Sequence, residues 1–215
     1  MALTRKALEL IFIEHRINEL GMLRKVPANH GVEIDLRTLN GDLILAHDAF
    51  KSGERFVDWL GECRHKLAVL NVKEDGLEEP LRELMKRSSV QNYFFLDQAM
   101  PTLIRDVIGG HTTSALRYSE YESIENLKYF AGKGLWLWVD CFTDRPYDSK
   151  LVTYARDLSY KICLVSPELH SSQREPEVEV LASQVLKSGV FPDAVCSKRA
   201  DIWIPVCEQA LIEEN

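Results

Sequence analysis

Residues 31–48 read G-V-E-I-D-L-R-T-L-N-G-D-L-I-L-A-H-D, and this stretch organises the chain. Its first half alternates apolar residues with Glu33 and Asp35, a period of two that predicts a β-strand with both carboxylates on one face. The N-G pair in the middle is a strong tight-turn signal, and the apolar run behind it predicts a returning strand that ends at His47. Two carboxylates followed by a histidine suggest chemistry, and a salt-bridged hairpin with an exposed histidine is the alternative.

The chain is long enough for one sizeable core, because it has 215 residues, of which 46% are apolar and 27% are charged. These fractions are close to those of average globular domains, so we expect a single domain over residues 1–215. The net charge is −7, and no cluster of Lys and Arg supplies the basic surface typical of nucleic-acid binding. We therefore expect no nucleic-acid partner, and affinity for anions only at a local site.

Cysteine spacing and hydropathy indicate the compartment. The five cysteines have no C-x-x-C spacing and mostly lie in apolar runs, which predicts reduced, buried thiols and no structural zinc site. The sequence shows no signal peptide and no apolar window of membrane-spanning length. We expect a soluble, cytoplasmic protein, and the sequence does not indicate its oligomeric state.

Eight short apolar segments alternate with amphipathic segments along the chain. Strands are predicted at residues 8–13, 32–36, 67–70, 93–96, 113–116, 134–139, 162–165 and 193–196. Helical segments are predicted at residues 18–29 (partly irregular), 52–63, 77–87, 101–108, 124–131, 150–158, 175–187 and about 201–212. This alternation favours parallel pairing, and eight units favour an α/β fold, a compact single-domain (β/α)8 TIM barrel. A doubly wound open sheet is the alternative, although no glycine-rich phosphate loop follows the first strand.

Polar residues gather at the ends of the predicted strands, which in a barrel form the mouth that holds the active site. They are His15, Arg16, Glu33, Asp35, Asn71, Lys73, Asp97, Arg117, Asp140 and Glu168. By contrast, the tryptophans of residues 134–139 are expected to pack in the core. The remaining histidines are expected at the surface or at helix ends, and they are His30, His65, His111 and His170.

The carboxylates of the central strand have the chemistry of a metal site. Glu33 and Asp35 offer oxygen ligands of the kind that Mg²⁺ or Ca²⁺ prefers, and Asn71 offers an amide oxygen. Lys73 lies two residues further on the same face, where an ammonium group would bind the phosphate that such a cation also contacts. Cleavage of a phosphodiester needs a base and an acid, and imidazoles titrate in the range that allows both roles.

The order of these motifs resembles the glycerophosphodiester phosphodiesterase family, which belongs to the phosphatidylinositol phospholipase C-like barrel superfamily. That family shows H-R-G, E-x-D, D-G, H-D and E-x-K in this order. The corresponding residues here are His15-Arg16, Glu33-x-Asp35, Asn40-Gly41, His47-Asp48 and Asn71-x-Lys73. Residues 192–201 are similar, more weakly, to the family's last-strand pattern, so the match covers roughly the first third of the chain and this tail.

The resemblance implies a divergent phosphoric diester hydrolase that cleaves a small-molecule phosphodiester and needs a divalent cation, Mg²⁺ or Ca²⁺. It implies that the catalytic acid and base are His15 and His47. It also implies that the cation is bound by Glu33, Asp35 and Asn71, and the phosphate by Arg16 and Lys73. Supporting roles, or places at the mouth, are expected for Asp48, Asp97, Arg117 and Asp140.

The chain departs from the family pattern at three places. Ile17 stands where the family has glycine, Asn71 stands where a third metal-binding acid is usual, and the segment from His15 to Glu33 is short. Fewer carboxylates should weaken metal affinity, although an amide remains a competent oxygen ligand. Two other functions stay open: a catalytically degenerate barrel that binds a phosphate or sugar phosphate, and an aldolase or isomerase that uses Lys73. The polar neighbours of Lys73 argue against the second, because an apolar pocket is what activates a catalytic lysine.

Overall fold

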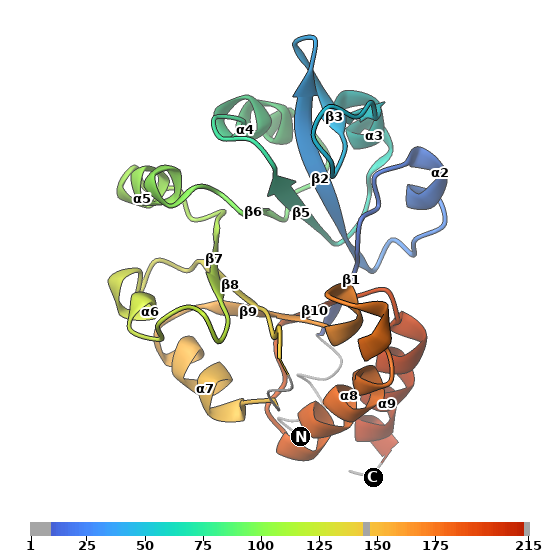
Figure 1. The fold of residues 1–215 in the computed structure, drawn as a ribbon, viewed down its shortest axis with the longest axis vertical. Coiled ribbons are helices and arrows are strands. Elements are labelled where there is room, and N and C mark those ends of the chain that lie inside the picture. The colour runs from blue at the N-terminus through green and yellow to red at the C-terminus, as the bar shows by residue number, and fades with distance from the viewer. Residues whose placement is uncertain (1–9, 144–146, 213–215) are drawn as a thin grey trace. The chain divides into compact units, whose positions relative to one another are not determined.

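The structure is a computed structural model that describes residues 10–143 and 147–212 (Figure 1). The contacts divide the chain into two compact units. We call Ile13–Ala115 the N-terminal unit, and Leu116–Asn215 together with Met1–Phe12 the C-terminal unit. The single domain expected over residues 1–215 stays a prediction.

The N-terminal unit is built on parallel strands, with β2 (Gly31–Leu39) at its centre. This strand pairs in parallel with β1 (Ile11–Glu14) on one side and with β5 (Leu67–Val72) on the other. In turn, β5 pairs in parallel with β6 (Tyr93–Leu96). All six residues of β5 are buried, as its unbroken apolar run predicts for a strand covered on both faces.

The predicted hairpin follows the central strand. Asn40 and Gly41 form the turn with φ angles of 53° and 88°, the left-handed values that a two-residue hairpin turn requires. The returning strand β3 (Asp42–Leu45) runs antiparallel to β2, and β4 (Glu54–Arg55) pairs antiparallel with β3. The short strand β4 is not among the predicted elements, since two charged residues give no strand pattern.

Helices connect the strands of this unit, with two departures from the sequence-based expectation. They are α2 (Leu20–Leu23), α3 (Phe56–Glu62), α4 (Glu78–Arg87) and α5 (Met100–Ile108). Residues 18–29 contain only the four-residue α2, because Pro27 disfavours helical geometry in the residue before it. Helix α3 begins at residue 56 rather than 52, because residues 54–55 belong to β4, and Val57 is 39% exposed rather than turned inward.

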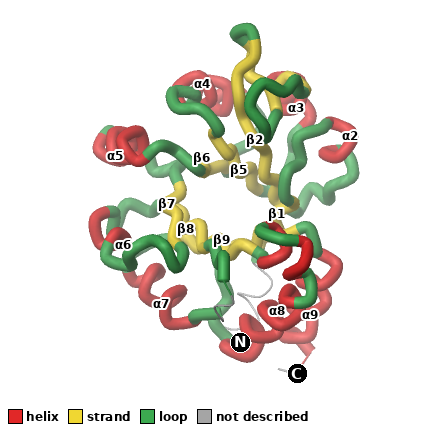
Figure 2. Tube along the Cα trace, in the orientation of Figure 1, coloured by secondary structure: helices red, strands yellow, loops and turns green. Residues whose placement is uncertain are grey.

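The C-terminal half repeats the strand-then-helix alternation, which Figure 2 shows as yellow segments followed by red ones. Its strands are β7 (Ala115–Tyr118), β8 (Trp136–Val139), β9 (Lys161–Val165) and β10 (Ala194–Ser197). Its helices are α6 (Asn126–Tyr129), α7 (Ser149–Asp157), α8 (Glu177–Ser188) and α9 (Ala200–Ile212), with short 3₁₀ turns η1 (Pro167–Leu169) and η2 (Ser172–Arg174). Strand β9 pairs in parallel with both β8 and β10. Helix α6 is shorter than the predicted segment 124–131.

Strand order decides between the two predicted topologies. Hydrogen bonds join the strands in the order β6-β5-β2-β1-β10-β9-β8-β7, and β3 pairs with β2 and β4 with β3. The first strand therefore lies beside the last and every other parallel neighbour is sequential, which is barrel connectivity rather than the reversed order of a doubly wound sheet. Between β6 and β7 the described residues form only an isolated bridge, Phe95 to Ser114, so hydrogen bonds do not close the sheet there.

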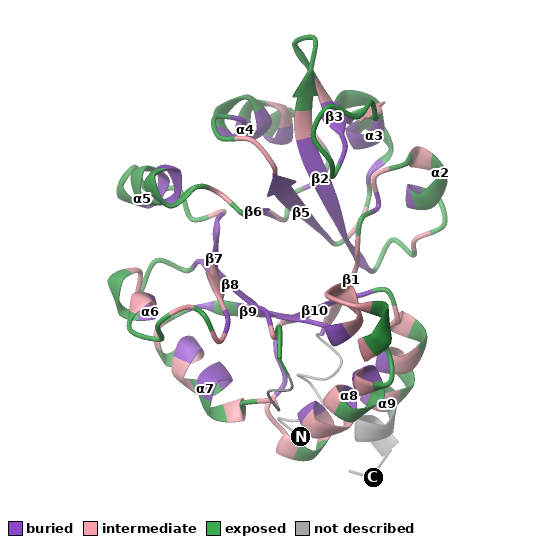
Figure 3. Cartoon of the chain, in the orientation of Figure 1, coloured by how far each residue is buried: buried purple, intermediate pink, exposed green. Residues whose placement is uncertain are grey.

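Burial follows the predicted pattern, with the strands and the inner faces of the helices buried (Figure 3). Ile17, the residue in place of the family's glycine, is 5% exposed within the core of the N-terminal unit, and its carbonyl accepts a hydrogen bond from Trp59 Nε1. Trp136 and Trp138 are buried as expected. His30 is buried rather than at the surface, because its Nδ1 lies 3.2 Å from a Glu14 carboxylate oxygen.

All five cysteines are thiols rather than disulfides, and four of them are buried, as their apolar surroundings predict. Cys141 is the exception, with intermediate exposure. Within residues 10–143 and 147–212, no helix combines the length and the apolar character needed to cross a bilayer.

Candidate functional site

A buried pair of carboxylates forms the centre of the candidate site in the N-terminal unit. Glu33 and Asp35 lie on β2 with side chains that are each 1% exposed. Strand alternation places both on one face, as predicted, and Arg16 approaches both of them. The adjacent parallel strands β1 and β5 deliver the residues around the pair, because the ends of parallel strands meet at one edge of the sheet.

Glu33 is held by groups from both neighbouring strands. Its Oε2 accepts a hydrogen bond from the backbone N–H of Arg16 at 2.8 Å, and its Oε1 accepts one from Asn71 Nδ2 at 2.9 Å. His15 Nε2 lies 3.7 Å from Glu33 Oε2. The structure thus brings three of the predicted site residues into direct contact with this carboxylate.

Asp35 is held by a different set of groups, one of which sequence reasoning missed. Asn18 forms a two-point clamp, in which its Nδ2 donates to Asp35 Oδ2 and its Oδ1 accepts the Asp35 backbone N–H, both at 2.8 Å. Lys73 Nζ lies 3.2 Å from Asp35 Oδ1 and 3.6 Å from Asp97 Oδ2. Asn18 was not predicted because no strand pattern marks it, and its place three residues after His15 was the available signal.

The negative charges of Glu33 and Asp35 repel each other, and the hydrogen bonds and positive charge around them offset only part of this repulsion. Burial and the charge of Asp35 raise the pKa of Glu33 to about 7, while hydrogen bonds from Asn71 and Arg16 and the charge of Lys73 act in the opposite direction. A carboxyl group whose pKa is raised to near neutral pH, by burial and by a second acid, is typical of catalytic sites and cation-binding sites.

The oxygen atoms of this site suit a divalent cation. Two buried oxygens, Asn71 Oδ1 and Asp35 Oδ1, accept no hydrogen bond from the described residues, although Asp35 Oδ1 forms an ion pair with Lys73 Nζ at 3.2 Å. Hard cations such as Mg²⁺ and Ca²⁺ take carboxylate and amide oxygens of this kind, so the residues fit such a group. Among the described residues, no group of three His, Cys, Asp or Glu side chains is placed to bind one metal ion. The candidate ligands are therefore two carboxylates and one amide.

The predicted second histidine lies on the loop that follows β3. His47 and Asp48 are 41% and 70% exposed, and His47 Nδ1 lies 2.8 Å from Asp48 Oδ1. The hydrogen bond from His47 holds the pKa of Asp48 below its usual value, and the positive charge of Arg16 adds to this effect. Within the described part of the chain no hydrogen bond or ion pair joins His47 to the carboxylate pair, so its catalytic role stays a prediction.

Arg117 and Asp140 form a separate cluster in the C-terminal unit. Asp140, with a side chain that is 2% exposed, forms an ion pair with Arg117 and lies 3.2 Å from His170 Nε2. His170 was expected at the surface or at a helix end, and it is the C-cap of η1 with a side chain that is 18% exposed, where burial lowers its pKa. Glu168 accepts hydrogen bonds from Ser197 Oγ and the Lys198 backbone, so its carboxylate ties the ends of β9 and β10 together.

Comparisons with known proteins bear on the fold. No family model and no curated protein matches the sequence. The structure is similar to the crystal structure of a glycerophosphoryl diester phosphodiesterase from Parabacteroides distasonis ATCC 8503, with 10% sequence identity and a TM-score of 0.66. The similarity covers 96% of this chain and 92% of that one. The resemblance predicted from the motifs is thus confirmed at the level of the fold, and the chain has the α/β barrel fold of this phosphodiesterase.

Proposed function

We propose that the chain is a phosphodiester hydrolase of the glycerophosphodiester phosphodiesterase type, which cleaves a small phosphodiester with the help of a divalent cation. The observation that carries the proposal is the buried pair Glu33 and Asp35, surrounded by an imidazole, a guanidinium, an amide and an ammonium group. The shared barrel fold supports it. The cysteine thiols also fit a reducing compartment, so we include a cytoplasmic location in the proposal.

Different side chains of the chain would bind the phosphate and transfer protons. Lys73 Nζ, held between Asp35 and Asp97, donates to a non-bridging oxygen, and Arg16 donates to another. His15 is placed to accept or donate a proton at the reacting oxygens, and His47 serves as its partner in the opposite role. A divalent cation bound by Glu33, Asp35 and Asn71 would supply charge neutralisation of the phosphate.

A binding module for a phosphate or sugar phosphate is the second candidate. The observation in its favour is that three of the four oxygens of Glu33 and Asp35 already accept hydrogen bonds, from the Arg16 backbone, Asn71 and Asn18. Such a site holds together without a cation, and an ammonium group beside it is enough to bind a phosphate. Turnover separates the two candidates.

The test is hydrolysis of bis(p-nitrophenyl) phosphate and a panel of glycerophosphodiesters, in EDTA and after restoring Mg²⁺, Mn²⁺ or Ca²⁺. We expect turnover that EDTA abolishes and one cation restores. Turnover that EDTA does not change would refute the cation requirement. If the folded protein hydrolyses none of these diesters with any cation but binds inorganic phosphate, the binding module replaces the hydrolase.

Replacing Asn71 with aspartate should restore the third acid that the family pattern contains. With another carboxylate among the ligands, we expect the affinity for Mg²⁺ or Ca²⁺ to rise by about 10-fold, because ligand charge sets the affinity of such sites. The measurement is the dependence of Tm on cation concentration in the variant and the unmodified chain. Replacing Asn92, an exposed asparagine outside the site, by aspartate is the control. Equal cation dependence in Asn71→Asp and the unmodified chain would exclude Asn71 as a ligand.

Replacing Arg16 with glycine should separate stability from activity. Arg16 has a φ of 57°, a left-handed value that costs an L-residue about 1–2 kcal/mol and glycine much less. We therefore expect Tm to rise, while turnover falls by roughly 10- to 100-fold because a charged donor to the phosphate is lost. Ser159, exposed with a φ of 70° in the C-terminal unit, gives the matched control. Ser159→Gly should raise Tm without affecting turnover, and undiminished turnover in Arg16→Gly would contradict the phosphate contact.

A further inference from the structure

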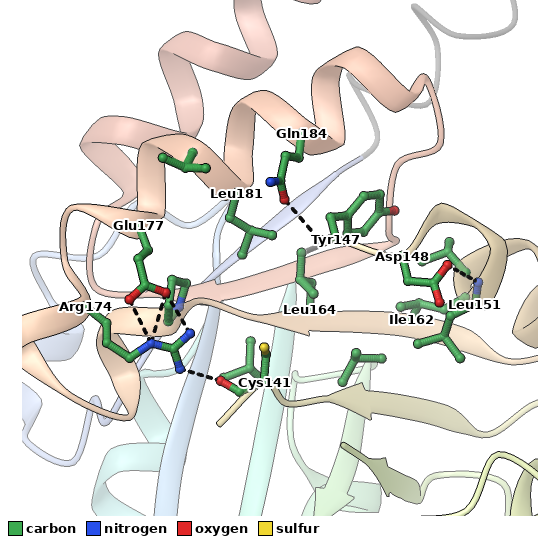
Figure 4. A pocket seen from close by; sticks show the side chains of 15 residues that line it. Cys141, Tyr147, Asp148, Leu151, Ile162, Leu164, Arg174, Glu177, Leu181 and Gln184 are labelled. Atoms are coloured by element: carbon green, nitrogen blue, oxygen red, sulfur yellow. Dashed lines mark hydrogen bonds and ion pairs between the residues drawn. The ribbon is translucent and has the colours of Figure 1, made fainter. Parts of the chain in front are cut away.

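A cavity of about 410 Å³ lies in the C-terminal unit, between α7 and α8 and against β9 (Figure 4). This volume falls within the range of small-molecule binding sites, about 300–1,000 Å³. Ile162 and Leu164 of β9 line it from the sheet, and Leu151 and Val152 line it from α7. Its walls are therefore mainly aliphatic.

Helix α8 presents one apolar stripe to the core and a second stripe, of mixed polarity, to the cavity. Val178, Ala182 and Val185 are buried. A second stripe of residues at helical spacing faces the cavity instead, and consists of Glu177, Val180, Leu181 and Gln184. Val180 is 56% exposed, which is unusual for a valine on an apolar stripe. The stripe extends over eight residues, about 10 Å along the helix, so the cavity offers an elongated wall that is apolar between its two polar ends.

The polar groups at the two ends of this wall differ in whether they have a hydrogen-bond donor available for a ligand. At one end Arg174 is already engaged, because it donates to both Glu177 carboxylate oxygens and to the carbonyls of Cys141 and Thr143. At the other end Gln184 Oε1 accepts the Tyr147 backbone N–H at 2.9 Å. Gln184 Nε2 donates no hydrogen bond to any described residue, so an amide donor remains for a ligand.

The charges of the described lining residues disfavour an anionic ligand. Among these residues Asp148 and Glu177 are acidic and Arg174 is basic, which gives them one net negative charge. Because Arg174 is neutralised by Glu177, the described lining residues present no unpaired cationic group that would bind a carboxylate or phosphate. An uncharged oxygen, as in an alcohol or ester, is the acceptor that suits Gln184.

We propose that this cavity binds an uncharged, single-chain amphiphile, with its alkyl chain along the second stripe of α8 and a head-group oxygen on Gln184 Nε2. The aliphatic walls favour an alkyl chain, because burial of apolar area drives binding and Tyr147 is the one aromatic residue among the described residues of the lining. The proposal is independent of phosphodiester hydrolysis.

Cys141 provides the readout, because it lines the cavity and is the one cysteine that is not buried. In the folded protein, Ellman's reagent should react fast with this thiol and slowly with the other four. We expect monodecanoylglycerol, below its micelle concentration, to slow the fast reaction and to raise Tm. Decanoate, with the same chain and an anionic head, should do so much less. Cys141→Ser should abolish the fast reaction and so assign it.

Variants of the cavity make the test specific. Val180→Trp, at an exposed position that tolerates a large side chain, should fill the cavity and abolish protection by monodecanoylglycerol. Gln184→Leu should weaken protection by about 5-fold, as expected for one lost neutral hydrogen bond. Lys187→Leu, at an exposed site on the same helix outside the cavity, is the matched control. In this variant monodecanoylglycerol should protect Cys141 as in the unmodified chain. Absent protection, equal protection in Val180→Trp, or equal binding of decanoate would each overturn the proposal.

Discussion

His15→Ala is expected to lower kcat for phosphodiester hydrolysis by about 10²–10⁴-fold, the usual contribution of a general acid or base. The His15 side chain is 13% exposed and lies 3.7 Å from the Glu33 carboxylate, at the end of β1. Its imidazole is thus placed beside the group that would bind the cation, where the phosphate would be held. His47→Ala is expected to have a comparable effect, because the proposed mechanism needs both an acid and a base.

The fold should survive both substitutions, since neither histidine belongs to the apolar core. Far-ultraviolet circular dichroism and Tm would verify this, and kcat would be measured with saturating cation. His111→Ala is the matched control, because His111 is exposed and lies outside the site. If both His15→Ala and His47→Ala keep full activity, acid-base catalysis by this pair is wrong. If only His15→Ala is inactive, His47 is not the partner.

Glu33→Gln is expected to abolish cation-dependent turnover and to remove the decline of stability with rising pH that Glu33 causes in EDTA. The pKa of Glu33 is raised from 4.5 to about 7 in the folded chain, so between these values the folded state binds more protons than the unfolded state. The free energy of unfolding therefore falls as pH rises through this window, by about 3 kcal/mol if Glu33 acts alone. Glutamine carries no charge, so the variant should lose this decline and be the more stable chain at pH 8.

Hydrogen bonding permits this substitution. Asn71 Oδ1 accepts no hydrogen bond from the described residues, so a rotated Asn71 amide can accept the new Gln N–H while the Arg16 backbone donates to its oxygen. Urea unfolding at pH 5 and pH 8, with EDTA or Mg²⁺, gives the measurement. Added cation should stabilise the unmodified chain more than the variant at pH 8. Glu19→Gln, at an exposed acid of the same unit, is the control, and a variant with unchanged pH dependence would contradict the charge repulsion.

The strands and the carboxylate pair were predictable because their signals are local. The alternation around Glu33 and Asp35 fixes their common face, and the unbroken apolar run of β5 indicates a strand buried on both sides. Because active-site residues of barrels lie at the carboxyl ends of the strands, Asn71 and Lys73 could be predicted at the same site before any contact was known.

The remainder depends on contacts between residues far apart in the sequence. Asn18 became part of the site because its amide matches both the carboxylate and the backbone N–H of Asp35, a pairing that no periodicity reveals. Likewise, β4 exists because β3 offers it a partner, and the half-buried His170 lies where it does because Asp140 accompanies it. Propensity and patterning describe one segment at a time, and these features arise from pairs.

The short strand β4 has a consequence for how the protein behaves at high concentration. It stands at one end of the hydrogen-bonded strand order, and its two residues, Glu54 and Arg55, are both charged. A free strand edge can template pairing with another molecule, and brevity and charge are what discourage such growth. We therefore expect this edge to resist self-association, so that lengthening β4 with uncharged β-branched residues would promote fibrils or strand-linked dimers.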